Sequence, residues 1–196
     1  MTKHALISVS DYAGLTKLAR KLVALGFTLV ASLGNAIYLE KQHVKVTRIQ
    51  TITKYSPMMM PNGIKSIHHL VFAGILADRN NEEHMMEVDK YHITTFDVVV
   101  CNFYPFQRMA SRHAPDKAIM QNIDIGGPAM VRCAAKNYRN VIIVTDPHDY
   151  DSVLTALEKG KTISVDARRE LAVKAFKLTK SYDDGIVTYL SRRTVS

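Results

Sequence analysis

The sequence contains little cysteine, with Cys101 and Cys133 as its two thiols in 196 residues. Both lie in apolar or alanine-rich segments without a CxxC partner, so a reducing compartment is expected rather than a disulfide framework. Long apolar runs are missing too: no segment approaches the ~18 apolar residues of a membrane span, and residues 1–10 show no signal-peptide core. We therefore expect a soluble, cytoplasmic protein with no membrane partner.

Two kinds of binding pattern are also missing. The eight histidines show no HExxH or Cys/His spacing, and the pair His68-His69 alone does not indicate a metal site. The chain has 26 Lys and Arg against 18 Asp and Glu, a net charge of +8 that favours anionic ligands. Because no Lys/Arg block with interleaved aromatic residues occurs, a small phosphorylated ligand is favoured over nucleic acid.

What the sequence does contain is an alternation of β-rich and helical runs. Leu15, Leu18, Leu22 and Leu25 recur at spacings of three and four residues, which predicts a helix that ends at Gly26. Strands that alternate with helices predict an α/β fold, a parallel sheet flanked by helices, and the length fits a single domain over residues 1–196. Strands are predicted at 5–10, 27–32, 45–49, 96–102 and 140–145, and helices at 14–25 and 35–42.

Two later segments differ from this alternation. Residues 50–66 contain two prolines, a glycine and three methionines, and they predict a loop with residues 58–60 packed beneath it. Residues 164–193 predict one or two long C-terminal helices, with Ser164 as the N-cap and Gly185 as the place where a bend is expected.

Polar residues follow the predicted strands. Ligands of parallel sheets bind outside the carboxyl ends of the strands, which directs attention to residues 8–11, 32–35, 102–105 and 145–147. The first two loops carry hydroxyls, an amide and a glycine before helices, which suits a phosphate. The alternative is that Ser10 or Asp11 merely caps the first helix and that Asn35 merely begins the second.

Residues 121–138 read QNIDIGGPAMVRCAAKNY, in which two glycines and a proline precede a run of small apolar residues. This pattern predicts a helix whose first residue is Pro128. The free N–H groups of its first turn favour an anion or a developing oxyanion, and Asp124 lies just outside them. Taken alone, the stretch is better explained by a tight turn with a capping acid.

Several stretches together resemble the IMP cyclohydrolase domain of the bifunctional enzyme AICAR transformylase/IMP cyclohydrolase, over residues 4–193. They are SVSDYAGL, LVASLGNA, IKSIHHLVFAGILA, VVCNFYPF, DIGGPAMVRCAAKN and KAFKLTKSYDDGIVTYL. The resemblance implies a methylglyoxal-synthase-like fold and a homodimer. It also implies closure of the purine ring of formyl-AICAR (FAICAR) to give IMP with loss of water, without metal or organic cofactor. Nothing of the transformylase domain is present, so a stand-alone protein or an excised domain is expected.

The resemblance also implies which residues act. Asp124 and Tyr104 would take or relay protons, Lys65 would hold charge, and Lys136 would donate or accept a proton. From Pro128, Lys136 lies eight residues along the helix, about 12 Å at the usual rise, so spacing alone does not bring it to Asp124. The implied substrate-binding residues are Ser8, Val9, Ser10, Ser32, Gly34, Asn35, Ile64, Ser66, Asn102, Phe103, Ile125, Gly126 and Gly127.

The phosphate loops depart from the family pattern. Tyr12 and Gly63 stand where the family has a lysine and an arginine, so two cations are missing. Leu33 and Asn35 replace a glycine and a threonine in the second loop. These changes leave a second hypothesis, a non-catalytic regulatory module that binds a nucleotide or phosphometabolite on the same fold. A weaker third hypothesis is nucleic-acid binding through the basic surface.

Overall fold

The computed structural model describes residues 2–54, 66–104, 106, 108, 115–158 and 163–192. Within these residues five strands form one sheet in the order β3-β2-β1-β4-β5, and every neighbouring pair is parallel. This confirms the predicted α/β class. The strands are β1 (Lys3–Ser8), β2 (Phe27–Ala31), β3 (Thr47–Arg48), β4 (Val98–Cys101) and β5 (Ile142–Val144).

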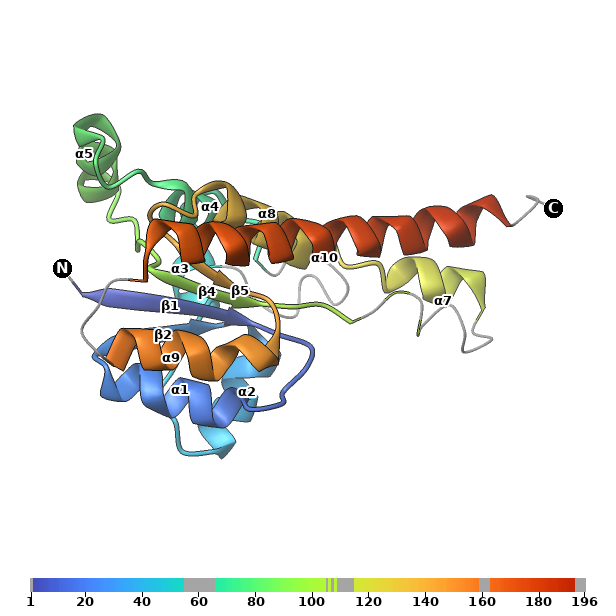
Figure 1. Ribbon diagram of the computed structural model, residues 1–196, viewed down its shortest axis with the longest axis horizontal. Helices are drawn as coiled ribbons and strands as arrows, with labels where there is room; N and C mark the ends of the chain where they lie inside the picture. Colours follow the sequence, from blue (N-terminus) through green and yellow to red (C-terminus); the bar gives the residue numbers. More distant parts are fainter. Residues whose placement is uncertain are drawn as a thin grey trace.

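Helices cover both faces of the sheet (Figure 1). Alternate residues of β4 explain how, because Val98 and Val100 belong to one hydrophobic core whereas Val99 and Cys101 belong to the other. One face is covered by α1 (Leu15–Ala24), α2 (Leu33–Lys41) and α9 (Tyr150–Glu158), and the other by α4 (His69–Leu76), α8 (Gly126–Lys136) and α10 (Val165–Ser191). Shorter elements are α3 (Gln50–Thr53), α5 (Glu82–Lys90), α7 (Asp116–Gln121) and the 3₁₀ turn η2 (Pro147–Asp149).

The leucine spacing of the first helix is confirmed. Leu15, Leu18 and Leu22 are buried on one face of α1. Gly26 follows the helix with φ of +84°, a conformation that glycine adopts without strain. The sequence therefore specifies both the buried face of α1 and the point where the chain turns back into β2.

α10 is one continuous helix of 27 residues. Ser164 is its N-cap, since its hydroxyl oxygen accepts a hydrogen bond from Ala167 N at 3.2 Å, as predicted. The helix continues through Gly185, which is buried, because packing against α8 and β5 outweighs the low helix propensity of glycine. Its last turns extend beyond the sheet towards α7 (Figure 1), where Tyr189 Oη donates to Asp116 Oδ1 at 2.8 Å.

Several predicted boundaries were wrong, and three of them bear on the segments around the site. α8 begins at Gly126 rather than at Pro128, which takes the third helical position, where its missing N–H would have had no partner within the helix. β3 is reduced to Thr47–Arg48, and α3 occupies part of the predicted loop over 50–66. The methionines at 58–60 lie outside the described residues.

Candidate active site

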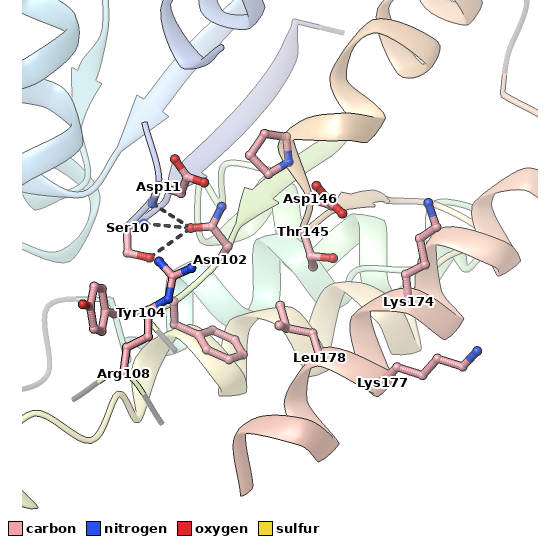
Figure 2. A pocket seen from close by; sticks show the side chains of 12 residues that line it. Ser10, Asp11, Asn102, Tyr104, Arg108, Thr145, Asp146, Lys174, Lys177 and Leu178 are labelled. Carbon is pink, nitrogen blue, oxygen red and sulfur yellow. Dashed lines mark hydrogen bonds between the residues drawn. The ribbon is translucent and has the colours of Figure 1, made fainter. Parts of the chain in front are cut away.

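The switch point of the sheet lies between β1 and β4, because the chain proceeds from β1 outward to β2 and β3 on one side and to β4 and β5 on the other. A pocket of about 700 Å³ opens there (Figure 2), a volume typical of small-molecule sites. Its walls come from the loops after β1, β4 and β5 and from α10. The lining residues are Ser10, Asp11, Asn102, Phe103, Tyr104, Arg108, Thr145, Asp146, Pro147, Lys174, Lys177 and Leu178.

Asn102 joins the two sides of the switch point. Its Oδ1 accepts hydrogen bonds from Ser10 N at 2.9 Å, Asp11 N at 3.1 Å and Ser10 Oγ at 3.2 Å. These bonds hold the loop after β1 against the end of β4, although the residues are far apart in sequence. The alternative that Ser10 or Asp11 caps α1 is wrong, because the N-cap of α1 is Gly14 and Asp11 Oδ1 accepts instead from Ala13 N.

On the β2 side of the same sheet edge, Asn35 forms hydrogen bonds to the chain after β1. Its side chain is buried, accepts from Val9 N at 2.9 Å through Oδ1, and donates to Val9 O at 2.9 Å through Nδ2. Asn35 therefore belongs to the interior of α2 and ties it to the chain after β1. Ser8, which directly precedes Val9, is the half-buried last residue of β1.

The start of α2 is covered by Tyr12. A Cβ added to Gly34 would lie 3.7 Å from the Tyr12 hydroxyl oxygen, and the Tyr12 ring packs on Tyr38 with centroids 4.4 Å apart. Burial, together with Tyr38, raises the pKa of Tyr12. Ser32 is the N-cap of α2 but makes no capping hydrogen bond through its side chain. Tyr12 therefore brings a hydroxyl group rather than a cation to the start of α2.

A second group of candidate residues surrounds the start of α8. Asp124 Oδ1 accepts from Gly127 N at 2.8 Å, and Asp124 N donates to Tyr182 Oη at 2.7 Å. A Cβ on Gly127 would lie 2.6 Å from Asp124 Oδ2, and one on Gly126 would lie 2.9 Å from Ser66 Oγ. Both glycines thus allow polar side chains to approach the helix start closely.

This second group adjoins the wall of the pocket. The Phe103 ring, which lines the pocket, packs edge-on against Tyr182 with centroids 4.7 Å apart. Cys101, at the end of β4, donates its thiol to Gly127 O at 3.8 Å. Burial, with a further contribution from Asp124, raises the pKa of the Cys101 thiol, so this cysteine stays neutral and is no nucleophile. Ile125, the N-cap of α8, is 65% exposed.

Lys136 is not brought to these residues. It is exposed at the last position of α8, which runs antiparallel to the strands, so the 11-residue helix separates it from Asp124 by about 16 Å. The neighbouring Asn137 donates to Ile75 O and Ala77 O, at the opposite edge of the sheet. Lys65 and Ile64 lie outside the residues that the structure describes.

Besides Asp146, which follows β5 as expected, the pocket contains basic residues that the sequence did not single out. Lys174 Nζ binds Asp149 Oδ1 at 2.5 Å. A hydrogen bond from the His148 backbone N–H, and further interactions with the His148 ring, lower the pKa of Asp146. Lys177 and Arg108 complete the basic lining. The spacing of Lys174, Lys177 and Leu178 indicates one helix face, but nothing local indicates that this face meets the sheet edge.

In the part of the chain that the structure describes, no helix is long and apolar enough to cross a membrane. Over the same residues, no group of three or more His, Cys, Asp or Glu side chains could hold a metal ion.

Parallel strands, helices on both faces and a pocket at the switch point define an α/β ligand-binding domain. Comparison with known proteins gives the family: the model of the MGS-like domain matches residues 14–129, and the chain belongs to this family. A model described as AICARFT/IMPCHase bienzyme matches residues 134–196.

Individual relatives agree with these matches. The chain is 42% identical over 194 residues to the bifunctional purine biosynthesis protein PurH of Persephonella marina, covering 98% of this chain and 37% of the relative. It is 41% identical over 191 residues to PurH of Acetivibrio thermocellus, covering 97% of this chain and again 37% of the relative. The chain thus spans little more than a third of the length of these curated relatives. A solved structure titled "Crystal structure of ForH" is 32% identical, with a TM-score of 0.83, and the match covers 96% of this chain and 98% of that one.

Proposed function

We propose that the protein is an IMP cyclohydrolase that closes the purine ring of FAICAR to give IMP with loss of water, in purine biosynthesis. The observation that carries this proposal is the pocket at the switch point, which collects Ser10, Asn102 and Tyr104 from two separate loops. The similarity to PurH proteins along almost the whole chain supports it. The reaction belongs to a single domain over residues 1–196.

The chemistry follows from the positions of Asp124 and Tyr104. The carboxamide nitrogen of the substrate attacks the formyl carbon and loses one proton, and the formamide nitrogen loses a second proton as the C=N bond of the new ring forms. Both protons are transferred to the formyl oxygen, which departs as water. Asp124 takes the first proton at the start of α8, and the Tyr104 phenol in the pocket relays the second. The positive end of the α8 dipole stabilises charge that develops on the formyl oxygen.

Positioning supplies the rest of the acceleration. Holding the amide and the formyl group face to face turns ring closure into a favourable intramolecular step. The loops after β1 and β2 bind the ribose phosphate through Ser8, Ser10 and Ser32, as the family resemblance implies. Lys65 holds charge beside the base, as the family resemblance implies. Lys136 makes no direct contact with the reacting atoms, given its place at the far end of α8.

The assembly and compartment follow the family resemblance. We propose a homodimer that acts in the cytoplasm on its nucleotide substrate, with no nucleic acid as partner. Light scattering on the purified protein tests the dimer, and a monomer at micromolar concentration would contradict it.

Ring closure assayed directly on purified protein tests the function. Tyr104→Phe and Asp124→Asn should each lower kcat by about 10²–10⁴-fold, the usual contribution of an acid or base. Asn keeps the oxygen that accepts Gly127 N–H, so the start of α8 should remain intact. Tyr91→Phe and Asp89→Asn, on exposed residues at the end of α5, are matched controls that should retain full turnover. No turnover by the wild-type protein at millimolar FAICAR would defeat the proposal.

A second candidate function is a non-catalytic module that binds a nucleotide to regulate a partner. It is favoured by the loop at β2, where Tyr12 stands over Gly34 and the Asn35 amide binds Val9. Thermal-shift measurements with IMP, XMP and AMP distinguish the two. Stabilisation by a nucleotide without turnover of FAICAR favours the module.

A further inference from the structure

The phosphate side of the proposed site lacks the cation that the family resemblance places at position 12. Tyr12 stands there, its hydroxyl lies over Gly34 and its ring packs on Tyr38. Because burial and Tyr38 raise the pKa of Tyr12, its phenol stays neutral at physiological pH and supplies no charge. A nucleotide phosphate at this edge therefore needs a cation from another element.

Arg108 provides a guanidinium at the switch point. It lines the same pocket as Ser10 and Asn102, and in Figure 2 its guanidinium group points towards these two residues. The three hydrogen bonds to Asn102 Oδ1 fix the loop after β1, so Ser10 and Asp11 hold constant positions in this corner of the pocket. The corner thus combines a fixed loop with a planar cation that suits phosphate geometry.

The other two cations of the pocket lie further along α10. Lys174 is bound to Asp149 Oδ1 at 2.5 Å. The ammonium group of Lys177 points away from Ser10 and Asn102 in Figure 2. Of the three cations that line the described pocket, Arg108 is the one whose charged group points towards Ser10 and Asn102 in Figure 2.

Charge balance leads to the same residue. Asp11 lines this corner, and its Oδ1 accepts from Ala13 N at 2.9 Å. Without a neighbouring cation, the Asp11 carboxylate would repel a phosphate group. Arg108 brings a positive charge to the same pocket and offers a fork of N–H donors to an anion.

We propose that Arg108 binds the phosphate of the nucleotide substrate, and that it replaces the cation missing at position 12. The phosphate then lies between the Arg108 guanidinium and the loop after β1, at the switch point itself. This assignment rests on the proposed function, because it concerns the nucleotide that the cyclohydrolase would bind.

The test compares IMP with inosine, which lacks the phosphate, by isothermal titration of the full chain. Arg108→Gln should weaken IMP binding by about 10- to 100-fold, because it removes charge-assisted hydrogen bonds. Inosine affinity should stay within about twofold, since its neutral ribose and base do not use the guanidinium. Arg108→Lys keeps the charge but loses the fork, and should fall between the two.

Arg169→Gln is the matched control. Arg169 is an exposed arginine on α10 that pairs with Asp166 outside the pocket, so its loss removes the same charge without touching the site. IMP affinity in this variant should stay within about threefold of wild type at physiological salt, because exposed charges at a distance are screened.

Each outcome decides the assignment. Equal weakening of IMP and inosine by Arg108→Gln, or no weakening of either, would overturn it, as would failure of the wild-type protein to bind IMP. If Arg108→Gln does not fold, Arg108→Lys decides, and an unchanged IMP affinity in that variant overturns the bidentate contact. Selective loss of IMP binding together with absent FAICAR turnover in the wild type would support the Arg108 assignment while defeating the cyclohydrolase.

Discussion

The two halves of the carboxyl edge use similar polar residues in different ways. On the β2 side, Asn35 is buried and both groups of its amide bind the backbone of Val9. On the β4 side, Asn102 accepts three hydrogen bonds at the exposed mouth of a pocket. Asn35 thus stabilises the interior of the protein, whereas Asn102 holds the loop that lines a surface pocket.

This difference shows that a loop motif does not determine which partner its polar side chain binds. Both asparagines follow strands, and both belong to stretches that resemble the phosphate and base contacts of one enzyme family. The partner of the side chain, rather than its place in the motif, determines whether it meets the chain or the substrate. Substitutions on the two sides should therefore differ in kind: loss of stability at β2 and loss of binding at β4.

The largest expected effect is on the β2 side. Asn35→Ala leaves the buried N–H and C=O groups of Val9 without partners, and should lower the free energy of unfolding by about 2–4 kcal/mol. Chemical denaturation measures it. Asn81→Ala, which removes the side-chain cap of α5 far from the edge, is the control and should cost about 1 kcal/mol. A loss of unfolding free energy in Asn35→Ala no larger than that in Asn81→Ala would contradict the predicted difference between the β2 and β4 sides.

Asn102→Ala should act mainly on binding. Its three hydrogen bonds involve exposed groups, so the free energy of unfolding should fall by only about 1–2 kcal/mol. The loop after β1 then loses its fixed position, and IMP affinity should fall by about tenfold or more, as measured by titration. Wild-type affinity in a folded Asn102→Ala protein would show that the bridge has no part in the site.

A smaller, pH-dependent effect on stability is expected at His68. His68 Nδ1 accepts from Leu70 N at 3.2 Å and caps α4. Burial, with a contribution from His69, lowers the pKa of His68, so the fold favours the neutral ring. The stability it contributes is present above about pH 6.5 and is lost as the pH falls through the lowered pKa. Protonation removes a cap worth about 1 kcal/mol.

His68→Asn sharpens this prediction, because asparagine can cap α4 without titrating. Thermal melts between pH 7.5 and 5 should show a smaller loss of Tm in His68→Asn than in the wild type, by a few degrees at most. Identical pH profiles for the two proteins would mean that the ring does not titrate with folding.

The smallest effect is expected at Lys136. Because it is exposed at the end of α8 remote from Asp124, Lys136→Ala should change the free energy of unfolding by less than about 0.5 kcal/mol. Turnover of FAICAR should stay within about threefold of wild type. A loss of more than about a hundredfold, with the fold intact, would mean that Lys136 reaches the substrate from a neighbouring copy or through a rearranged helix.

Much of the fold could be predicted because its signals are local. Leu15, Leu18 and Leu22 define a helix face within eight residues, and buried strands such as Val98–Cys101 read as apolar runs. Boundaries were less certain where two local rules compete. Pro128 suits the first helical position but fits equally in the third, and the close approach of Asp124 to Gly127 determined the outcome.

The site was predicted only in part, for a long-range reason. Tyr104 and Asn102 could be found because they follow a strand directly. Arg108 could not, because no local pattern indicates that it lines the same pocket as Ser10, which follows another strand. The amide of Asn35 was expected at a phosphate and binds Val9 instead, because no sequence pattern reveals which of two nearby partners a side chain takes.

One face of α10 has a consequence for redesign. Lys174 and Leu178 line the pocket, and Tyr182, four residues further on, binds the backbone of Asp124. A rotation or translation of α10 would therefore displace both the lining of the pocket and Asp124. A change of substrate preference is therefore better sought in the pocket-lining residues that follow β5 than on this face of α10.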